Sequence, residues 1–307
     1  MSPANQPRVI HEIAELKAAI QAARAAGKQI GVVPTMGALH EGHLSLVDAA
    51  RRDCDFIVAT IFVNPTQFGP GEDFSKYPRT LAKDVELLSP RGVDLVFAPE
   101  ASAIYGPEHV TKVILDGPAL SLEGDARPTH FAGVATIVLK LFNLVQPDRA
   151  YFGRKDFQQA MVVQRMVADL DVPVEVIVCP TVRETDGLAM SSRNVYLSPE
   201  ERQRALSLSQ ALSLARQLIA DGELDVATIQ QRMRDVLTAA DAEIDYVAIC
   251  SAATLAPLSR IEGPAVALVA ARIGKTRLID NELLNASDGP RKGLESSGKG
   301  PTGPGKG

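Results

Sequence analysis

The first 180 residues alternate between short apolar runs and segments with helical apolar spacing. The short runs are rich in β-branched residues and predict strands at 30–33, 56–63, 95–98, 112–115, 150–152 and 174–178. Apolar residues three and four positions apart predict helices at 13–26, 45–52, 81–88, 131–145 and 157–170. Because the strands are apolar throughout, they favour an α/β fold with a Rossmann-like parallel sheet and helices on both faces.

After residue 185 the pattern changes. Ser198-Pro199-Glu200-Glu201 is a capping box with proline at the first helical position, and it opens a predicted helix. Together with a second helix and later strand-like runs, it predicts a smaller C-terminal α+β domain. These segments are 198–220, 226–240, 246–249, 266–271 and 277–279.

The chain therefore divides into three parts. Residues 1–185 form the Rossmann-like domain, and residues 186–287 form the small domain, which we expect to act as a lid. Residues 288–307 hold 7 of the 23 glycines and almost nothing apolar. Such a segment buries no core, so we expect a disordered tail.

Composition and charge limit the partners. Lys+Arg number 32 and Asp+Glu 37, a net charge of −5. This argues against nucleic acid or an anionic membrane as the main partner, because both need a basic face. The longest apolar stretch, 131–139, is far shorter than the roughly 20 residues of a membrane span. Cys54, Cys179 and Cys250 lie too far apart for a metal motif or a disulfide framework, so we expect a soluble, cytoplasmic protein.

The most informative segment is the histidine turn, residues 33–44, with the sequence VPTMGALHEGHL. It links the first predicted long strand to a helix, at the sheet edge where parallel α/β folds bind ligands. Gly37 lets the backbone pass close to a ligand, and the helix N-terminus offers free N–H groups to an anion. His40 and His43 share one helical face and suit hydrogen bonds to phosphate oxygens. Capping or packing histidines remain an alternative, as does a metal pair, although no third ligand has a recognisable spacing.

Three further polar segments accompany it. The amide loop, residues 62–69, carries Asn64 and Gln67, which also suit an ordinary turn. The serine loop, residues 188–194 (LAMSSRN), is small and polar with one cation, at the domain boundary. Each of these two is weak evidence alone.

The third is the lysine turn, residues 151–159, which repeats the layout of strand, glycine, charged turn and helix. Lys155 is placed to reach a phosphate. Asp156 suits either a helix cap or a ribose hydroxyl, and Gln159 faces the same side one turn later.

The order of these segments is more specific than any one of them. A His-x-Gly-His turn followed much later by Met-Ser-Ser-Arg resembles the two signatures of the nucleotidylyltransferase and class I aminoacyl-tRNA synthetase superfamily. The full strings PTMGALHEGH, FVNPTQF, YFGRKDFQQ and DGLAMSSRN together resemble the pantothenate synthetase (pantoate–β-alanine ligase) family. The resemblance covers roughly residues 10–285.

The resemblance implies an ATP-dependent ligase that condenses (R)-pantoate with β-alanine through pantoyl adenylate, releasing pyrophosphate and then AMP. Neither step needs an enzyme nucleophile, so catalysis would rest on positioning and on stabilising charge at phosphorus. The resemblance also implies ATP as co-substrate, Mg²⁺ carried on the triphosphate, and a homodimer.

Functional positions transfer to this chain residue by residue. The catalytic positions are His43, as an acid, with His40, Lys155 and Arg193 near the phosphates. The ATP positions are Met36, Gly37, Ala38, Leu39, His40, Glu41, Gly42, His43, Gly153, Arg154, Lys155, Asp156, Val182, Met190, Ser191, Ser192 and Arg193. The positions for pantoate and β-alanine are Gln67, Gln159, Asn64, Tyr77, Arg127 and His130. Asp84 is the expected carboxylate for Mg²⁺, with an ordinary surface aspartate as the alternative.

Other functions of the same turn stay open. A nucleotidylyltransferase would transfer AMP to a phosphorylated substrate and keep it in the product. A tRNA synthetase is disfavoured by the small C-terminal region and the acidic body. A nucleotide-binding sensor would bind ATP without turnover.

Overall fold

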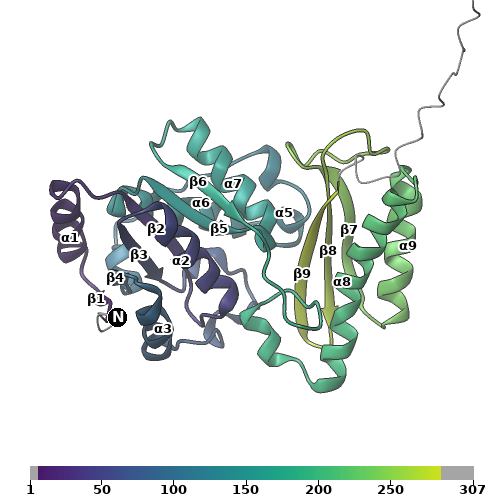
Figure 1. Cartoon of the computed structure of the whole chain (residues 1–307), viewed down its shortest axis with the longest axis horizontal. Helices are drawn as coiled ribbons and strands as arrows, with labels where there is room; N and C mark the ends of the chain where they lie inside the picture. Colours follow the sequence, from purple (N-terminus) through teal and green to yellow (C-terminus); the bar gives the residue numbers. More distant parts are fainter. Residues whose placement is uncertain (1–5, 285–307) are drawn as a thin grey trace, which may run out of the picture.

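A computed structural model describes residues 6–284, which form two sheets with their covering helices (Figure 1). The first part contains β1 (Arg8–Ile10), α1 (Ile13–Ala25), β2 (Ile30–Thr35), α2 (Glu41–Asp53), β3 (Phe56–Ile61), α3 (Leu81–Leu88), β4 (Leu95–Phe97), α4 (Ala101–Ile104), α5 (Glu123–Ala126), α6 (His130–Val145), β5 (Arg149–Gly153), α7 (Phe157–Asp169) and β6 (Glu175–Cys179). The second contains α8 (Pro199–Ala220), α9 (Val226–Ala239), β7 (Glu243–Ser251), β8 (Ala265–Ile273) and β9 (Thr276–Leu284). The expected tail at 288–307 lies outside the described residues.

The first sheet is parallel and has the strand order β1-β4-β3-β2-β5-β6. β3 and β4 follow β2 on one side, whereas β5 and β6 lie on the other, so the order reverses between β2 and β5. At such a switch point the loops leaving the two strands diverge and open a crevice at the carboxyl edge. The histidine turn leaves β2 and the lysine turn leaves β5, so the topology brings both to this crevice.

Both faces of this sheet are buried, which confirms the prediction made from its continuously apolar strands. Val32 belongs to a core shared with α1, α6 and α7, to which Leu16 and Phe142 contribute. Its neighbour Val33 belongs to the opposite core, beneath α2 and α3. Successive side chains of a strand point to opposite faces, so a strand between two helical layers must be apolar at every position.

The second sheet is antiparallel, in the order β7-β8-β9. On one face, Val269 of β8 packs with Leu208 of α8 and Met233 of α9. On the other face, Leu268 packs with Phe157 at the start of α7, so this sheet lies against the first domain. In Figure 1, β9 is the edge strand that faces the first domain. We propose that the domain boundary lies near residue 185, between β6 and α8.

The start of α8 confirms the predicted capping box. Ser198 Oγ accepts a hydrogen bond from Glu201 N, and Glu201 Oε2 accepts one from Ser198 N.

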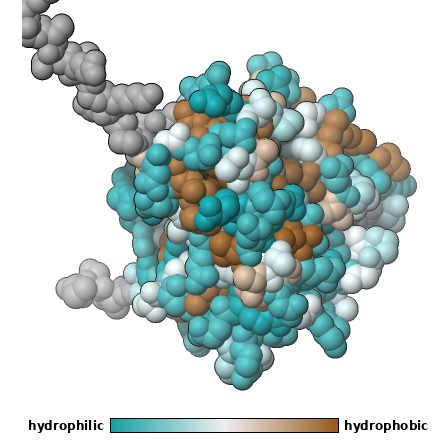
Figure 2. Space-filling model, turned by 90° about the vertical axis from the view of Figure 1, so that its right-hand side faces the viewer, coloured by the Kyte–Doolittle hydropathy of each residue, from teal (hydrophilic) through white to brown (hydrophobic). Residues whose placement is uncertain are grey.

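Figure 2 looks onto the side of the molecule formed by the C-terminal domain, where hydrophilic residues separate several small hydrophobic patches. Apolar residues of α8 and α9 pack inward against the small sheet, for example Leu208 and Met233.

The sequence prediction is wrong about two strands. The expected strand at 112–115 pairs with no strand of the described chain; instead Val113 N donates to Thr136 Oγ1 of α6 at 2.9 Å. A β-branched segment forms a strand only where the edge of another strand is available for hydrogen bonding. Here the hydrogen-bond acceptor is instead a side-chain hydroxyl of α6. Conversely, the three residues of β1 were not predicted, because so short a strand is defined only by its pairing with β4.

Among residues 6–284, none of the helices combines the length and the apolar composition needed to cross a membrane.

Candidate active site

A cavity of about 210 Å³ lies at the carboxyl edge of the parallel sheet. Its walls come from the segments that follow β2, β3, β5 and β6, from the serine loop and from one side of α6. The histidine turn, the amide loop, the lysine turn and the serine loop are distant in sequence. They meet here because parallel strands all end at one edge.

The two histidines of the histidine turn lie side by side at this cavity. His40 is the N-cap of α2, and its Nδ1 accepts a hydrogen bond from Gly42 N at 3.2 Å. Because Nδ1 is the acceptor, the proton of the neutral ring lies on Nε2. The His43 ring lies 4.1 Å from that of His40, centroid to centroid. A Cβ at Gly42 would lie 2.9 Å from the His40 ring, so glycine is what leaves room for this cap.

Burial governs the charge of both rings. Burial, together with the nearby His40 and Lys155, lowers the pKa of His43 from 6.5 to about 3. Burial, assisted by Lys155, lowers the pKa of His40 to about 4. Both imidazoles are therefore neutral at pH 7 in the protein alone, and they suit hydrogen-bond donation better than proton transfer. A bound phosphate anion would favour the protonated forms.

Asp84 of α3 holds the histidine turn in place. This buried carboxylate accepts hydrogen bonds from Ala38 N at 3.1 Å and Leu39 N at 2.8 Å, and Thr80 Oγ1 donates to it as well. Ala38 has a φ of 51°, in the left-handed region that is unfavourable for residues other than glycine, so these bonds stabilise a strained turn.

This arrangement corrects the alternative expectation for Asp84, that of an ordinary surface aspartate. The residue is buried rather than on the helix surface, and it does not line the cavity. Its oxygens face backbone N–H groups and a hydroxyl. We therefore propose that Asp84 holds the histidine turn rather than Mg²⁺.

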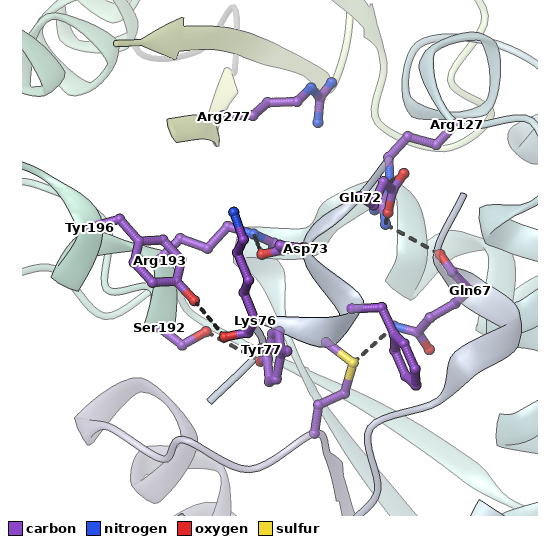
Figure 3. Close-up of polar contacts among 12 residues, drawn as sticks. Gln67, Glu72, Asp73, Lys76, Tyr77, Arg127, Ser192, Arg193, Tyr196 and Arg277 are labelled. Atoms are coloured by element: carbon purple, nitrogen blue, oxygen red, sulfur yellow. Dashed lines mark hydrogen bonds and ion pairs between the residues drawn. The ribbon is translucent and has the colours of Figure 1, made fainter. Parts of the chain in front are cut away.

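The amides of the amide loop are buried at the cavity, and Asn64 is also a turn residue, because its Oδ1 accepts from Thr66 N at 3.3 Å. Asn64 Nδ2 donates to Gln67 Oε1 at 3.0 Å and to Gly133 O at 3.1 Å. Gln67 Nε2 donates to Met36 Sδ at 3.1 Å (Figure 3). A thioether is a weak acceptor, so this amide retains capacity for a ligand. A Cβ on Gly133 would lie 2.5 Å from Thr66 O, so glycine is what lets α6 pack against this loop.

His130 supports the amide loop from α6. Its Nδ1 lies 3.0 Å from Gln67 O, and its Nε2 lies 3.2 Å from Arg127 Nη1. These partners require a neutral ring that donates from Nδ1 and accepts at Nε2. Burial and the Arg127 charge lower the pKa of His130 to about 4, in agreement with that form.

Two guanidinium groups at the cavity are paired with carboxylates of one short segment (Figure 3). Glu72 Oε2 accepts from Arg127 Nη2 at 2.7 Å, and Asp73 Oδ1 accepts from Arg193 Nη2 at 3.0 Å. Burial by itself raises the pKa of each carboxyl, but its arginine outweighs this and lowers the pKa overall. Both acids therefore stay ionised, and an anionic substrate must share these arginines with them.

The serine loop closes the same side of the cavity. Ser191 Oγ accepts from Arg193 N at 3.2 Å, and Ser192 Oγ lies 3.2 Å from the Tyr77 hydroxyl (Figure 3). Lys155 also lines this cavity, and its Nζ lies 3.8 Å from Asp156 Oδ1. Hydroxyls, an ammonium and a guanidinium thus surround one space, as an anionic ligand requires.

Most of the predicted site residues line the cavity. They are Met36, His40, Gly42, His43, Asn64, Gln67, Tyr77, Arg127, His130, Gly153, Lys155, Asp156, Gln159, Val182, Met190, Ser191, Ser192 and Arg193. Predicted residues outside the lining are Gly37, Ala38, Leu39, Glu41, Asp84 and Arg154.

These outlying residues have other surroundings. Leu39 belongs to the core beneath α2, and Glu41 pairs with Arg91 on the outside of that helix. The Arg154 carbonyl accepts a hydrogen bond from Asn281. Whether any of them touches ATP stays a prediction.

Sequence reasoning missed several residues that shape the cavity. Glu72 and Asp73 lie in a Gly-Pro-Gly-Glu-Asp run, and nothing local marks them as partners of distant arginines. Pro180 and Thr181 follow β6 directly, so the rule that every parallel strand ends at the site edge is a signal for them. Apolar residues of α6 also line the cavity, namely Val134, Ile137, Val138 and Leu141.

Comparison with known proteins identifies the family. The family model described as Pantoate-beta-alanine ligase matches residues 8–283. The chain belongs to this ligase family. Its sequence is 53% identical over 281 residues to the pantothenate synthetase of Moorella thermoacetica, a match that covers 91% of this chain and 99% of the relative. The pantothenate synthetase of Thermotoga neapolitana is 51% identical over 278 residues, covering 90% and 99%.

Solved structures of the pantoate–β-alanine ligase family share the fold. The pantothenate synthetase of Thermus thermophilus matches 90% of this chain and 98% of its own, with a TM-score of 0.86 and 50% identity. The pantoate–β-alanine ligase of Francisella tularensis matches 90% of this chain and 97% of its own, with a TM-score of 0.76 and 32% identity. The Francisella structure is described as a complex with βγ-ATP and β-alanine.

Proposed function

We propose that this chain condenses pantoate with β-alanine in an ATP-dependent ligation that passes through pantoyl adenylate. Family membership and the described ligands of the Francisella relative support the reaction. The observation that carries the proposal is the meeting of the histidine turn, amide loop, lysine turn and serine loop around one cavity. Its cations suit anionic substrates, and its apolar α6 wall suits the branched aliphatic part of pantoate.

In the first step, a pantoate carboxylate oxygen forms a bond to the α-phosphorus of ATP, and the bond to pyrophosphate breaks. Negative charge on the phosphates would be stabilised by Lys155, Arg193 and the neutral imidazoles of His40 and His43. The remaining task is positioning, which we assign to the amides of Gln67 and Gln159 for pantoate.

In the second step, the β-alanine amine forms a C–N bond to the acyl carbon, AMP leaves, and the amine loses a proton. Gln67 would contact this amino acid as well as pantoate. The apolar side chains of α6 keep part of the cavity free of polar groups, which protects a reactive acyl adenylate from water.

The site fits Mg²⁺ that arrives on the triphosphate. Among residues 6–284, no group of three or more histidine, cysteine, aspartate or glutamate side chains is arranged to hold a metal ion. Asp156, Ser191 and Ser192 supply oxygens at the cavity that would contact the ion or its waters. Mg²⁺ needs few protein ligands, because phosphate oxygens and water fill most of its coordination positions. When bound, it would neutralise part of the phosphate charge.

Incubation of the protein with ATP, pantoate and β-alanine tests the reaction. We expect pyrophosphate to be released from ATP when pantoate is present, with or without β-alanine. AMP should be released only when β-alanine is present as well. A nucleotidylyltransferase would keep AMP in its product, and a sensor would bind ATP without releasing either. Mass spectrometry of a reaction without β-alanine should detect pantoyl adenylate.

We also propose a homodimer that works in the cytoplasm. The segment around the unpaired 112–115 run exposes apolar side chains, with Val110 89% and Ile114 76% accessible in one copy of the chain. A second copy would bury them. Sedimentation at equilibrium should give twice the chain mass, and a monomer over the whole concentration range would rule the dimer out.

A further inference from the structure

A single side chain of the C-terminal domain grips the lysine turn. Asn281 lies on β9 and is 3% exposed. Its Nδ2 donates to Lys155 O at 2.7 Å and to Arg154 O at 2.9 Å. One amide group of the second domain therefore holds the backbone that carries the phosphate-binding lysine of the first.

The neighbouring residue fixes the position of Asn281 itself. Asp280 Oδ1 accepts a hydrogen bond from Asn281 N at 2.8 Å, and Asp280 Oδ2 pairs with Arg183 Nη1 at 2.6 Å. The same Arg183 Nη1 donates to Gly187 O at 3.2 Å, just before the serine loop. Two adjacent residues of β9 thus connect the lysine turn with the segment leading into the serine loop.

The lysine turn has little side-chain support of its own. The 3₁₀ turn Arg154–Asp156 has no side-chain cap, and neither does the start of α7 that follows it. The histidine turn differs, because His40 caps α2 and Asp84 binds two of its N–H groups. Support for the lysine turn has to come from elsewhere, and Asn281 provides it.

We infer that Asn281 is a positioning residue for Lys155, acting across the domain interface to place its ammonium group against the phosphates of ATP. This inference rests on the proposed function, because it assumes that Lys155 binds the triphosphate. A displacement of about 1 Å at a group that stabilises a transition state is enough to slow a reaction about 100-fold.

The test is a double-mutant cycle between Asn281 and Lys155. Asn281→Asp keeps the side-chain size but points an anionic oxygen at two carbonyl oxygens, so it should push the lysine turn away. With ATP, pantoate and β-alanine all present, so that the enzyme turns over, we expect kcat/KM for ATP, measured from pyrophosphate release, to fall about 10- to 100-fold. In a Lys155→Ala background, the same Asn281→Asp change should cost less than about threefold, because the group it positions is gone.

Two further variants separate positioning from stability. Asn281→Ser keeps one donor and should fall between wild type and Asn281→Asp. Leu237→Ala removes a buried side chain from the C-terminal core, far from the lysine turn, and should lower the melting temperature without changing kcat/KM. The inference is overturned if Asn281→Asp lowers kcat/KM by the same factor with and without Lys155. It is also overturned if Leu237→Ala lowers kcat/KM in proportion to its drop in melting temperature, because loss of stability would then explain the loss of activity.

ATP affinity measured by calorimetry for wild type, the two single variants and the double variant keeps this test apart from the proposed function. If wild type binds ATP but makes no product, the ligase assignment fails, while the coupling between Asn281 and Lys155 is still measured in the dissociation constants. If wild type is active and the two substitutions act independently in both measurements, only the positioning role fails.

Discussion

The histidine turn and the lysine turn occupy equivalent places in the fold but are held in different ways. Each follows a central parallel strand, at the point where the strand order reverses. The histidine turn is held by Asp84 from α3 of its own domain. The lysine turn is held by Asn281 from the edge strand of the other domain. Half of the site is therefore preformed within one domain, and the other half depends on the domain interface.

A buried ion pair anchors that interface close by. Glu123 of α5 accepts hydrogen bonds from both terminal nitrogens of Arg277 on β9, at 2.7 and 2.8 Å, and from the Tyr246 hydroxyl at 2.8 Å. Burial raises the pKa of Glu123, but Arg277 outweighs this and lowers it overall, so the glutamate stays ionised. The small sheet is thus bound to the first domain through Arg277, which lies on the same strand as Asn281.

Removal of the His43 side chain should have the largest effect on the preformed half. His43→Ala should lower kcat about 10²- to 10³-fold with little change in ATP affinity, because the imidazole donates to charge that develops in the transition state. Steady-state kinetics with calorimetric ATP binding measure this. A loss of ATP affinity with unchanged kcat would contradict the role.

The buried histidines should also make stability depend on pH. An unfolded histidine has a pKa near 6.5, whereas His43 in the folded protein has a pKa of about 3. The unfolded chain therefore binds more protons as the pH falls below 6.5, and the stability present above that pH is lost. Between pH 6.5 and 4.5 this one ring should account for roughly 2 kcal/mol of unfolding free energy. Denaturant titrations of wild type and His43→Gln measure it, and identical slopes with pH would refute it.

Asp84→Asn tests whether the hold on the histidine turn is local. An amide nitrogen would face one of the two N–H groups, so the strained Ala38 loses a bond and kcat should fall about 10-fold. Asp94→Asn is the matched control, because Asp94 accepts a hydrogen bond from Ile57 N outside the cavity lining. Two results would contradict a local hold by Asp84 on the histidine turn. One is an equal loss of activity in Asp84→Asn and Asp94→Asn. The other is an effect of Asp84→Asn that becomes small in a Lys155→Ala background, as we expect for Asn281→Asp.

Gln67→Ala should have the smallest effect, because the amide loop keeps its other bonds. Asn64 still donates to Gly133 O, and His130 still holds the backbone at residue 67. We expect KM for pantoate and for β-alanine to rise about fivefold, the loss of one neutral hydrogen bond, with kcat nearly unchanged. Initial rates with each substrate varied will show this, and unchanged KM for both would remove Gln67 from the site.

The spacing of apolar and polar residues predicted most helices and strands, because their formation depends largely on residues close together in the sequence. The α8 capping box and the continuously apolar strands are such cases, and the structure confirms both. The 112–115 run failed for the opposite reason: its composition suits a strand, but pairing depends on an edge elsewhere in the fold. The same holds for β1, which exists only through β4.

For the candidate site, residues within recognisable strings were found from sequence, and most of them line one cavity. Their supports were not found. Asp84 looked like a surface or metal-binding residue, and Asn281 lies in a stretch of strand with no motif. A motif records which chemical groups are needed, but the residues that hold those groups act through contacts between distant segments, which no local spacing reveals.

Sequence alone established the strand and helix alternation, the four polar segments and the family that they resemble, because each depends on residue type and short-range order. The tertiary structure decided the neutral state of the histidines, the pairing of Arg127 and Arg193 with Glu72 and Asp73, and the hold of Asn281 on the lysine turn. These depend on burial and on the approach of groups far apart along the chain, and those exist only after the two domains have packed together.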